Sequence, residues 1–178
     1  MTATRKEFLK HVDGFVMSVG IDDGRHRHLT FKKPETFNRH FHITTWPGYL
    51  AISGDMDSYI FTRLPDMFEF FRGKGINLSY WAEKVVSGKD QIQTFDWDTF
   101  KGNVWEEFDR YWEGTEDLDD RNTCLELLQD SLSCTNEDQY GAAELIRDFN
   151  YDDFYFRDWE HESKTYGFHY IWCLNAIV

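Results

Sequence analysis

The spacing of apolar residues changes once along this 178-residue chain, near Leu64, and this change constrains the fold more than any other feature. Before Leu64, apolar and polar residues alternate, as at Leu29 and Phe31, and such alternation is typical of strands. After it, apolar residues recur every three or four positions, as in helices. The sequence therefore predicts an α+β fold, with an antiparallel sheet of about four to five strands in residues 1–64 and a mostly helical, acidic part in 65–178 packed on it.

Turn residues divide the chain into the expected elements. The pairs Asp23-Gly24 and Pro47-Gly48 favour tight turns between antiparallel strands, because glycine accepts positive φ. We expect strands at 16–21, 25–32, 41–46, 49–53 and 58–64. We expect helices at 4–12, at 65–73, and then at about 78–86, 97–112, 119–133, 136–149 and 168–178, with Thr135 and Asp138 as the cap signal of the 136–149 helix.

Length and composition predict a single domain spanning residues 1–178 with an aromatic-rich core, since Phe, Tyr and Trp make up 18% of the chain. No apolar run reaches the ~18–20 residues of a membrane helix, and the first ten residues are polar, so we expect no membrane association and a cytoplasmic protein. The three cysteines fit neither a disulfide framework nor a zinc pattern.

Charge is distributed unevenly along the chain. The net charge is −13; residues 1–90 contain 13 Lys and Arg against 11 Asp and Glu, whereas residues 91–178 contain six against 21. A strongly anionic half repels phosphate, so the sequence predicts no direct binding of nucleic acid. A charged partner is instead expected to be basic.

The densest acidic segment interleaves carboxylates with aromatic residues at helical spacing, which predicts an apolar stripe facing the core and carboxylates turned outward. We call its ten members the acidic fan: Asp96, Asp98, Glu106, Glu107, Asp109, Glu113, Glu116, Asp117, Asp119 and Asp120. A rigid array of this kind can imitate DNA phosphates and occupy a basic groove. The alternative is a solvated face that only maintains solubility. Glu137, Asp138, Asp152 and Asp153 form a secondary acidic set.

A family resemblance favours the first interpretation. Between His40 and Arg72 the chain contains a Thr-Trp-Pro-Gly turn, a Gly-Asp-Met turn and an Asp-Met-Phe-Glu-Phe-Phe-Arg segment. With these motifs it resembles a family of small, mostly uncharacterised proteins of tailed phages and prophages. Small phage proteins are often host-directed inhibitors, so the resemblance implies a non-enzymatic protein of the host cytoplasm. Its partner would be a host nucleic-acid-handling or defence complex, such as a CRISPR effector or a restriction enzyme.

Enzymatic chemistry has weaker candidates, because the chain contains no phosphate-binding loop, dinucleotide fingerprint, nucleophile elbow or zincin motif. The histidines at 26, 28, 40 and 42 alternate on two neighbouring strands and could hold a metal, although nearby arginines would repel a cation. A second set consists of Asp158, His161, Glu162 and His169. Asp55 and Asp57 could act as paired carboxylates, but their loop favours turn hydrogen bonds to its own backbone. We therefore expect no cofactor and no metal, with a small enzyme or metal protein as the alternative function.

The last eleven residues, 168–178, form an apolar segment with no polar cap. We expect it to lie in the core, or to contact a second copy of the protein, which would suit a phage structural or assembly factor. Members of the resembled family continue past this point, so the resemblance also allows a shortened form.

Overall fold

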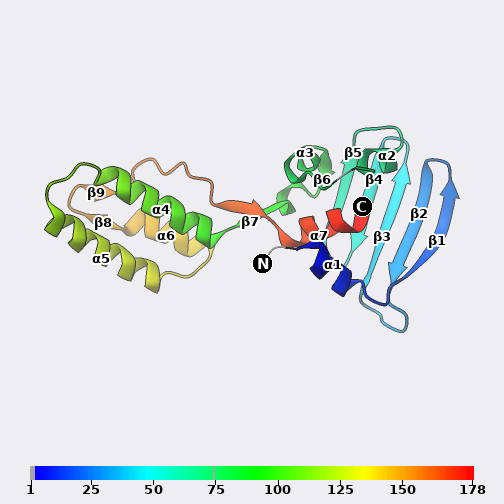
Figure 1. Ribbon diagram of the computed structural model, residues 1–178, viewed down its shortest axis with the longest axis horizontal. Helices are drawn as coiled ribbons and strands as arrows, with labels where there is room; N and C mark the ends of the chain where they lie inside the picture. The colour runs from blue at the N-terminus through cyan, green and yellow to red at the C-terminus, as the bar shows by residue number, and fades with distance from the viewer. Residues whose placement is uncertain (1–2, 74) are drawn as a thin grey trace. The chain divides into compact units, whose positions relative to one another are not determined.

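The computed structural model describes residues 3–73 and 75–178 and shows an α+β protein (Figure 1). The chain divides into two compact units. The sheet unit comprises the residues up to Gln93 together with Tyr166–Val178, and the helical unit comprises Thr94–Thr165. A domain is defined by cooperative unfolding, which this division does not measure, so the single domain stays a prediction.

A six-stranded antiparallel sheet forms the framework of the sheet unit, with the strands in sequence order. The strands are β1 (Val16–Asp23), β2 (His26–Lys32), β3 (His40–Trp46), β4 (Tyr49–Gly54), β5 (Ser58–Thr62) and β6 (Val85–Ser87). The turn glycines Gly24 and Gly48 have φ values of 61° and 86°, as their turns require. The antiparallel meander of about four to five strands predicted up to Leu64 is confirmed, with β1 to β5 as its strands.

Alternation of side chains gives the sheet one buried face. On β3, Phe41 and Ile43 are 4% and 3% exposed, whereas the alternate residues His40 and His42 are half-buried. The register places Ile43 opposite Ile52 of β4, and Ile52 opposite Tyr59 of β5. Opposed residues of antiparallel strands point to the same face, so these side chains line a common apolar layer.

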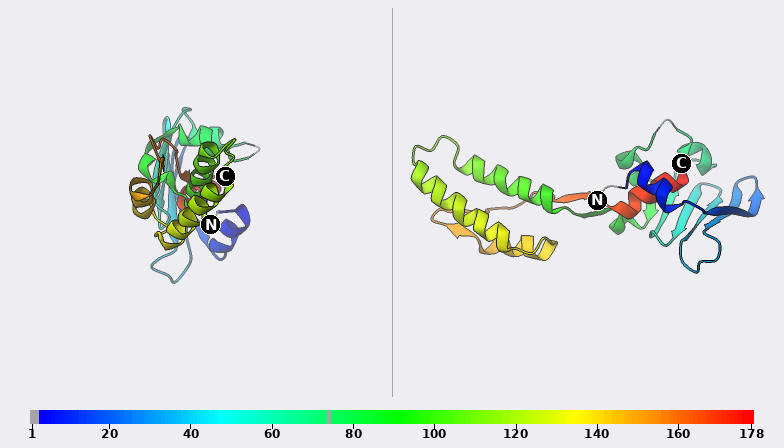
Figure 2. Two further views of the ribbon diagram at one scale, coloured as in Figure 1. Left: turned by 90° about the vertical axis from the view of Figure 1, so that its left-hand side faces the viewer. Right: turned by 60° about the horizontal axis from the view of Figure 1, so that its bottom comes forward.

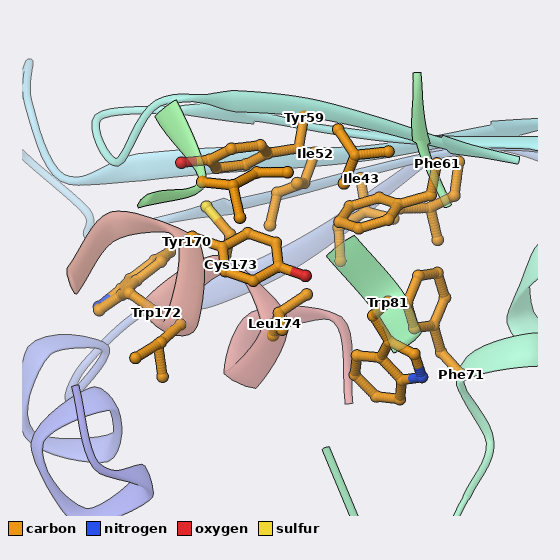
Figure 3. Packing of buried hydrophobic residues seen from close by; sticks show 14 of the residues in the cluster. Ile43, Ile52, Tyr59, Phe61, Phe71, Trp81, Tyr170, Trp172, Cys173 and Leu174 are labelled. Carbon is orange, nitrogen blue, oxygen red and sulfur yellow. The ribbon is translucent and has the colours of Figure 1, made fainter. Parts of the chain in front are cut away.

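Helices α1 (Arg5–His11), α2 (Met67–Phe71), α3 (Leu78–Ala82) and α7 (Phe168–Ile177) supply the other half of this core (Figures 1 and 2). Thr4 caps α1 through a capping box with Glu7. The short η1 turn (Lys89–Gln91) follows β6. Figure 3 shows Tyr170, Trp172 and Leu174 of α7 packed beneath the sheet.

The apolar C-terminal segment therefore lies in the core, as the sequence predicts. Tyr170 and Leu174 are fully buried, and the Tyr170 hydroxyl donates a hydrogen bond to the Leu78 carbonyl oxygen at 3.1 Å. Burial raises the pKa of the Tyr170 hydroxyl above its usual range. Contact with a second copy through this segment stays a prediction.

The helical unit contains α4 (Trp97–Tyr111), α5 (Leu118–Cys134), α6 (Gln139–Asp148) and the hairpin of β8 (Asn150–Tyr151) and β9 (Phe154–Tyr155). Strands β7 (Gln93–Phe95) and β10 (Lys164–Tyr166) pair with each other. The apolar stripes of α4, α5 and α6 form a cluster of their own. Among the described helices after residue 94, α7 is therefore the one that contributes buried residues to the sheet core.

Two predicted boundaries after Leu64 are wrong. The expected helix at 78–86 ends at Ala82, and Val85 continues into β6, where it pairs with Phe61. The predicted cap residue Thr135 instead follows the last residue of α5, while Asp138 caps α6 by accepting the backbone N–H groups of Tyr140 and Gly141. The short strands β7 to β10 were also not predicted.

Within residues 3–73 and 75–178, none of the helices is both long and apolar enough to cross a membrane.

Candidate functional site

The excess of negative charge lies entirely in the helical unit. Residues 94–165 contain all 21 Asp and Glu of the anionic half against six Lys and Arg, a net charge of −15. The residues of the sheet unit contain 11 acidic and 13 basic side chains, a net charge of +2. The charge boundary therefore coincides with the boundary between the compact units.

Regular burial on the helices directs most of these carboxylates to solvent. Phe100, Val104 and Phe108 of α4 are buried at intervals of four residues, and Cys124 and Leu128 of α5 repeat this spacing. Residues four apart share one helix face, so the intervening polar positions lie on the outer faces. The predicted combination of an inward apolar stripe and outward acidic residues is therefore present on α4.

An acidic row runs along the outer side of α4 and into the turn that follows it. Glu106, Asp109 and Glu113 are exposed and lie three and four residues apart. A helix rises 1.5 Å per residue, so the first two lie about 4.5 Å apart along its axis. The axial spacing of phosphates on one DNA strand, about 3.4 Å, is of the same order.

Several members of the acidic fan have partners within the helical unit. Asp96 and Asp117 cap α4 and α5, accepting the backbone N–H groups of Thr99 and Asp120. The ion pairs are Asp98 with Lys101 at 2.9 Å, Glu106 with Arg110 at 3.4 Å, and Asp109 with Arg121 at 3.3 Å. Exposed pairs of this kind contribute little to stability, and their charges remain available at the surface.

Two members of the fan are half-buried and contact other segments of the helical unit, so they are less outward than predicted. Glu107 Oε1 lies 2.5 Å from His161 Nε2 and 2.7 Å from Arg110 Nη1, and the His161 contact is the main cause that lowers the pKa of Glu107. Asp120 accepts a hydrogen bond from the Tyr151 hydroxyl, which raises the pKa of Tyr151 to about 12. The Arg110 pairing follows from helical spacing, but His161 and Tyr151 are too distant in sequence for spacing to predict them.

The turn between α4 and α5, together with the first residues of α5, carries the least engaged carboxylates (Figure 1). Glu113, Glu116 and Asp119 are exposed, and among the described residues none of their side chains has an ion-pair or hydrogen-bond partner. They lie within seven positions of one another, directly after the acidic row on α4. This turn and the row together form the surface most available to a basic partner.

The secondary acidic set is divided among structural roles. Asp138 is the N-cap of α6, and Asp152 and Asp153 form the turn between β8 and β9, where Asp152 has a φ of 48°. Glu137 is exposed next to the cap. These residues add to the negative field of the helical unit.

Two of the four candidate histidines of the sheet, His28 and His42, contact each other and neighbouring threonines. His28 and His42 stack with ring centroids 5.5 Å apart, and their Nδ1 atoms lie 2.9 Å from Thr44 Oγ1 and 3.0 Å from Thr30 Oγ1. Partial burial, followed by the neighbouring His40 and His28, lowers the pKa of His42. In the part of the chain that the structure describes, no three His, Cys, Asp or Glu side chains form a group that could hold a metal ion.

The two histidines of the second candidate set, His161 and His169, lie in different ion pairs. His161 contacts Glu107, whereas His169 Nδ1 lies 2.8 Å from Asp57 Oδ2. Among the described residues, the predicted hydrogen bonds of Asp55 to the backbone of its own loop are not formed. Asp55 instead accepts hydrogen bonds from the backbone N–H groups of Arg39 and His40. The register of β3 and β4 brings these backbone groups to Asp55, which spacing within the loop does not indicate.

Comparison of the chain with protein-family models, with curated proteins and with solved structures finds no match.

Proposed function

We propose that this is a phage-encoded, non-enzymatic binding protein that acts stoichiometrically on a host protein with a basic nucleic-acid-binding surface. Its target would be a nucleic-acid-handling or defence complex, as in anti-CRISPR or anti-restriction inhibition, and its mechanism would be DNA mimicry. The observation that carries the proposal is the coincidence of a net charge of −15 with one compact unit. The phage origin rests on the resemblance of the segment between His40 and Arg72.

The physical argument depends on rigidity as well as charge. A flexible acidic tail would lose backbone entropy on binding, whereas the backbone of helices that share a packed core is already ordered. Such an array releases counterions from a basic groove much as DNA does, so binding should weaken as salt is added. An acidic face that serves only solubility would bind no basic groove and would show no salt-dependent binding.

Affinity capture from host lysate tests the proposal. The tagged protein is incubated with lysate at low and at high salt, with and without excess duplex DNA, and retained proteins are identified by mass spectrometry. We expect a nucleic-acid-binding protein or complex that is retained at low salt and released by high salt and by duplex DNA. Retention that neither salt nor DNA reduces would contradict the mimicry mechanism.

A further inference from the structure

A small cavity in the sheet unit is lined by residues from four separate segments. His11 ends α1, His40 begins β3, Met56 follows β4, and Trp172 belongs to α7. Its volume is about 190 Å³. An engineered apolar cavity of about 150 Å³ takes up benzene, so this one is large enough for a ligand with a single ring.

Residues with unsatisfied polar atoms are concentrated around this cavity. Among the described residues, four buried side-chain nitrogen or oxygen atoms have no hydrogen-bond partner, and three of them belong to lining residues: His11 Nδ1, His40 Nδ1 and Trp172 Nε1. Trp172 is only 3% exposed, and its indole N–H can act only as a donor. Figure 3 shows the indole nitrogen on the side of the ring away from Leu174. Buried polar groups are normally paired. The indole N–H requires an acceptor, and a His Nδ1 that carries the ring proton would donate to the same acceptor.

The charged residues of the cavity also favour an acceptor. Its carboxylate, Asp55, is already engaged, because Oδ2 accepts the backbone N–H groups of Arg39 and His40. Asp55 Oδ1 lies 3.4 Å from His40 Nδ1, a contact that lacks hydrogen-bond geometry. The Arg39 guanidinium contacts the His11 carbonyl oxygen at 3.1 Å and adds a positive charge.

Backbone strain occurs at the same place. Arg39 has a φ of 68°, a left-handed conformation that is costly for a residue with a side chain. Asp55 holds the strained segment through the N–H groups of Arg39 and His40. Such strain is typically retained where a ligand or a reaction requires it.

We propose that this cavity binds a small organic carboxylate with a single-ring apolar body. The ring packs against Phe15 and Met56, and the carboxylate accepts hydrogen bonds from Trp172 Nε1 and from a ring nitrogen of His11 or His40. Arg39 supplies the compensating positive charge. This site belongs to the sheet unit and does not depend on the function proposed for the helical unit.

Titration of ¹⁵N-labelled protein with benzoate tests the site, with the indole N–H resonances as the readout. We expect one indole resonance, assigned to Trp172 by its loss in Trp172→Phe, to shift saturably with a dissociation constant below about 5 mM. Benzyl alcohol has a similar ring but no charge, and we expect it to bind about tenfold more weakly.

Two variants make the test specific. Trp172→Phe keeps an aromatic ring but removes the donor, and His11→Phe fills part of the space from the half-buried end of α1; each should weaken benzoate binding about tenfold, measured by calorimetry. Trp105→Phe, in the helical unit, is the matched control and should change nothing. The proposal is overturned if the Trp172 resonance does not shift up to about 50 mM benzoate, well above that expected constant. It is equally overturned if His11→Phe binds benzoate as the wild type does.

Discussion

Glu107 is a carboxylate of the helical unit whose environment separates it from its neighbours on α4. Its side chain is 26% exposed, and it contacts both His161 Nε2 and Arg110 Nη1. The His161 hydrogen bond and the positive charge of Arg110 lower the pKa of Glu107, and together they outweigh partial burial, which acts in the opposite direction. Glu107 therefore ties α4 to the segment that follows β9 rather than serving the acidic surface.

The lowered pKa of Glu107 predicts a pH dependence of stability. Ionised Glu107 stabilises the folded state above the ordinary value of 4.5, and this contribution is lost as the pH falls through the lower folded-state value. We expect Glu107→Gln to reduce the free energy of unfolding at pH 7 and to flatten its decline below about pH 4.5. Urea unfolding followed by circular dichroism between pH 7 and pH 3 measures both effects.

Glu113→Gln is the matched control, because the Glu113 side chain is exposed and has no partner among the described residues. Its unfolding curves should follow the wild type within about 0.5 kcal/mol at each pH. Equal pH profiles for Glu107→Gln and the wild type would show that the contact with His161 does not stabilise the fold.

At this scale the sequence predicts faces better than partners. Helical spacing correctly places Glu106 and Asp109 on the outer side of α4 and the buried phenylalanines on the inner side. It does not predict that Glu107 and Asp120 are half-buried, since their partners His161 and Tyr151 come from segments beyond α6. Contacts between distant segments depend on the assembled fold, which a periodicity does not contain.

Two glycines within helices of the helical unit give opposite predictions for the same substitution. A Cβ added at Gly102 of α4 would have no atom within 4 Å in the described part of the chain, whereas one at Gly141 of α6 would lie 2.3 Å from the Asn136 carbonyl oxygen. Gly102→Ala should stabilise the protein by about 0.5–1 kcal/mol, because alanine loses less conformational entropy in a helix. Gly141→Ala should destabilise it by about 1–3 kcal/mol, through overpacking against backbone.

Chemical denaturation of the two alanine variants measures this contrast in one experiment. The prediction concerns the sign, so changes of the same sign in both variants would contradict the packing of α6 against the segment that precedes it. Circular dichroism of the native state checks that helix content is retained.

Elements with a strong local signal were predicted, and those made by tertiary pairing were not. In residues 78–86 the apolar positions Leu78, Trp81, Ala82, Val85 and Val86 follow a helical period, which explains the prediction of one helix. Pairing of Val85 with Phe61 of β5 instead draws the second half of this segment into the sheet as β6. Strands of two or three residues, such as β8 and β9, are too short to show an alternation.

At the scale of the molecule, the described residues form two hydrophobic clusters that share no buried residue. Leu128 is fully buried in the cluster of the helical unit, and Leu128→Ala should destabilise that unit by about 2–5 kcal/mol. We expect amide hydrogen exchange to accelerate throughout residues 94–165, with a smaller change in β3 and β4. Mass spectrometry of peptic fragments resolves the two regions.

Ile52→Ala, in the cluster of the sheet unit, is the matched control and should give the reverse pattern. Equal acceleration in both regions for both variants would show that the units unfold together, as the predicted single domain requires.

At the scale of the molecule the sequence predicts the α+β class and the charge asymmetry. It does not predict that the boundary of the compact units falls after Gln93 rather than after Leu64, because the segment with α2, α3 and β6 contributes buried side chains such as Phe71 and Trp81 to the sheet core. The charge change near residue 90 is the sequence signal that lies closest to this boundary.

The most direct test of the proposed function compares two sets of charge reversals in binding to the captured target. The first variant changes Glu113, Glu116 and Asp119 of the helical unit to Lys, and the second changes Asp22, Asp23 and Glu35 of the sheet unit; all six residues are exposed, and the change in net charge is equal. Reversal at Asp119 also opposes the helix dipole of α5, so circular dichroism must show that the fold is retained.

The dissociation constant for the target, measured at 0.05, 0.15 and 0.3 M salt (Debye lengths of roughly 14, 8 and 6 Å), is the deciding quantity. The account predicts that the helical-unit variant loses binding by at least about a hundredfold at low salt, while the sheet-unit variant stays near the wild type, whose own affinity falls as salt rises. Equal affinities for both variants, or an affinity indifferent to salt, would contradict the claim that the carboxylates of the helical unit form the binding surface.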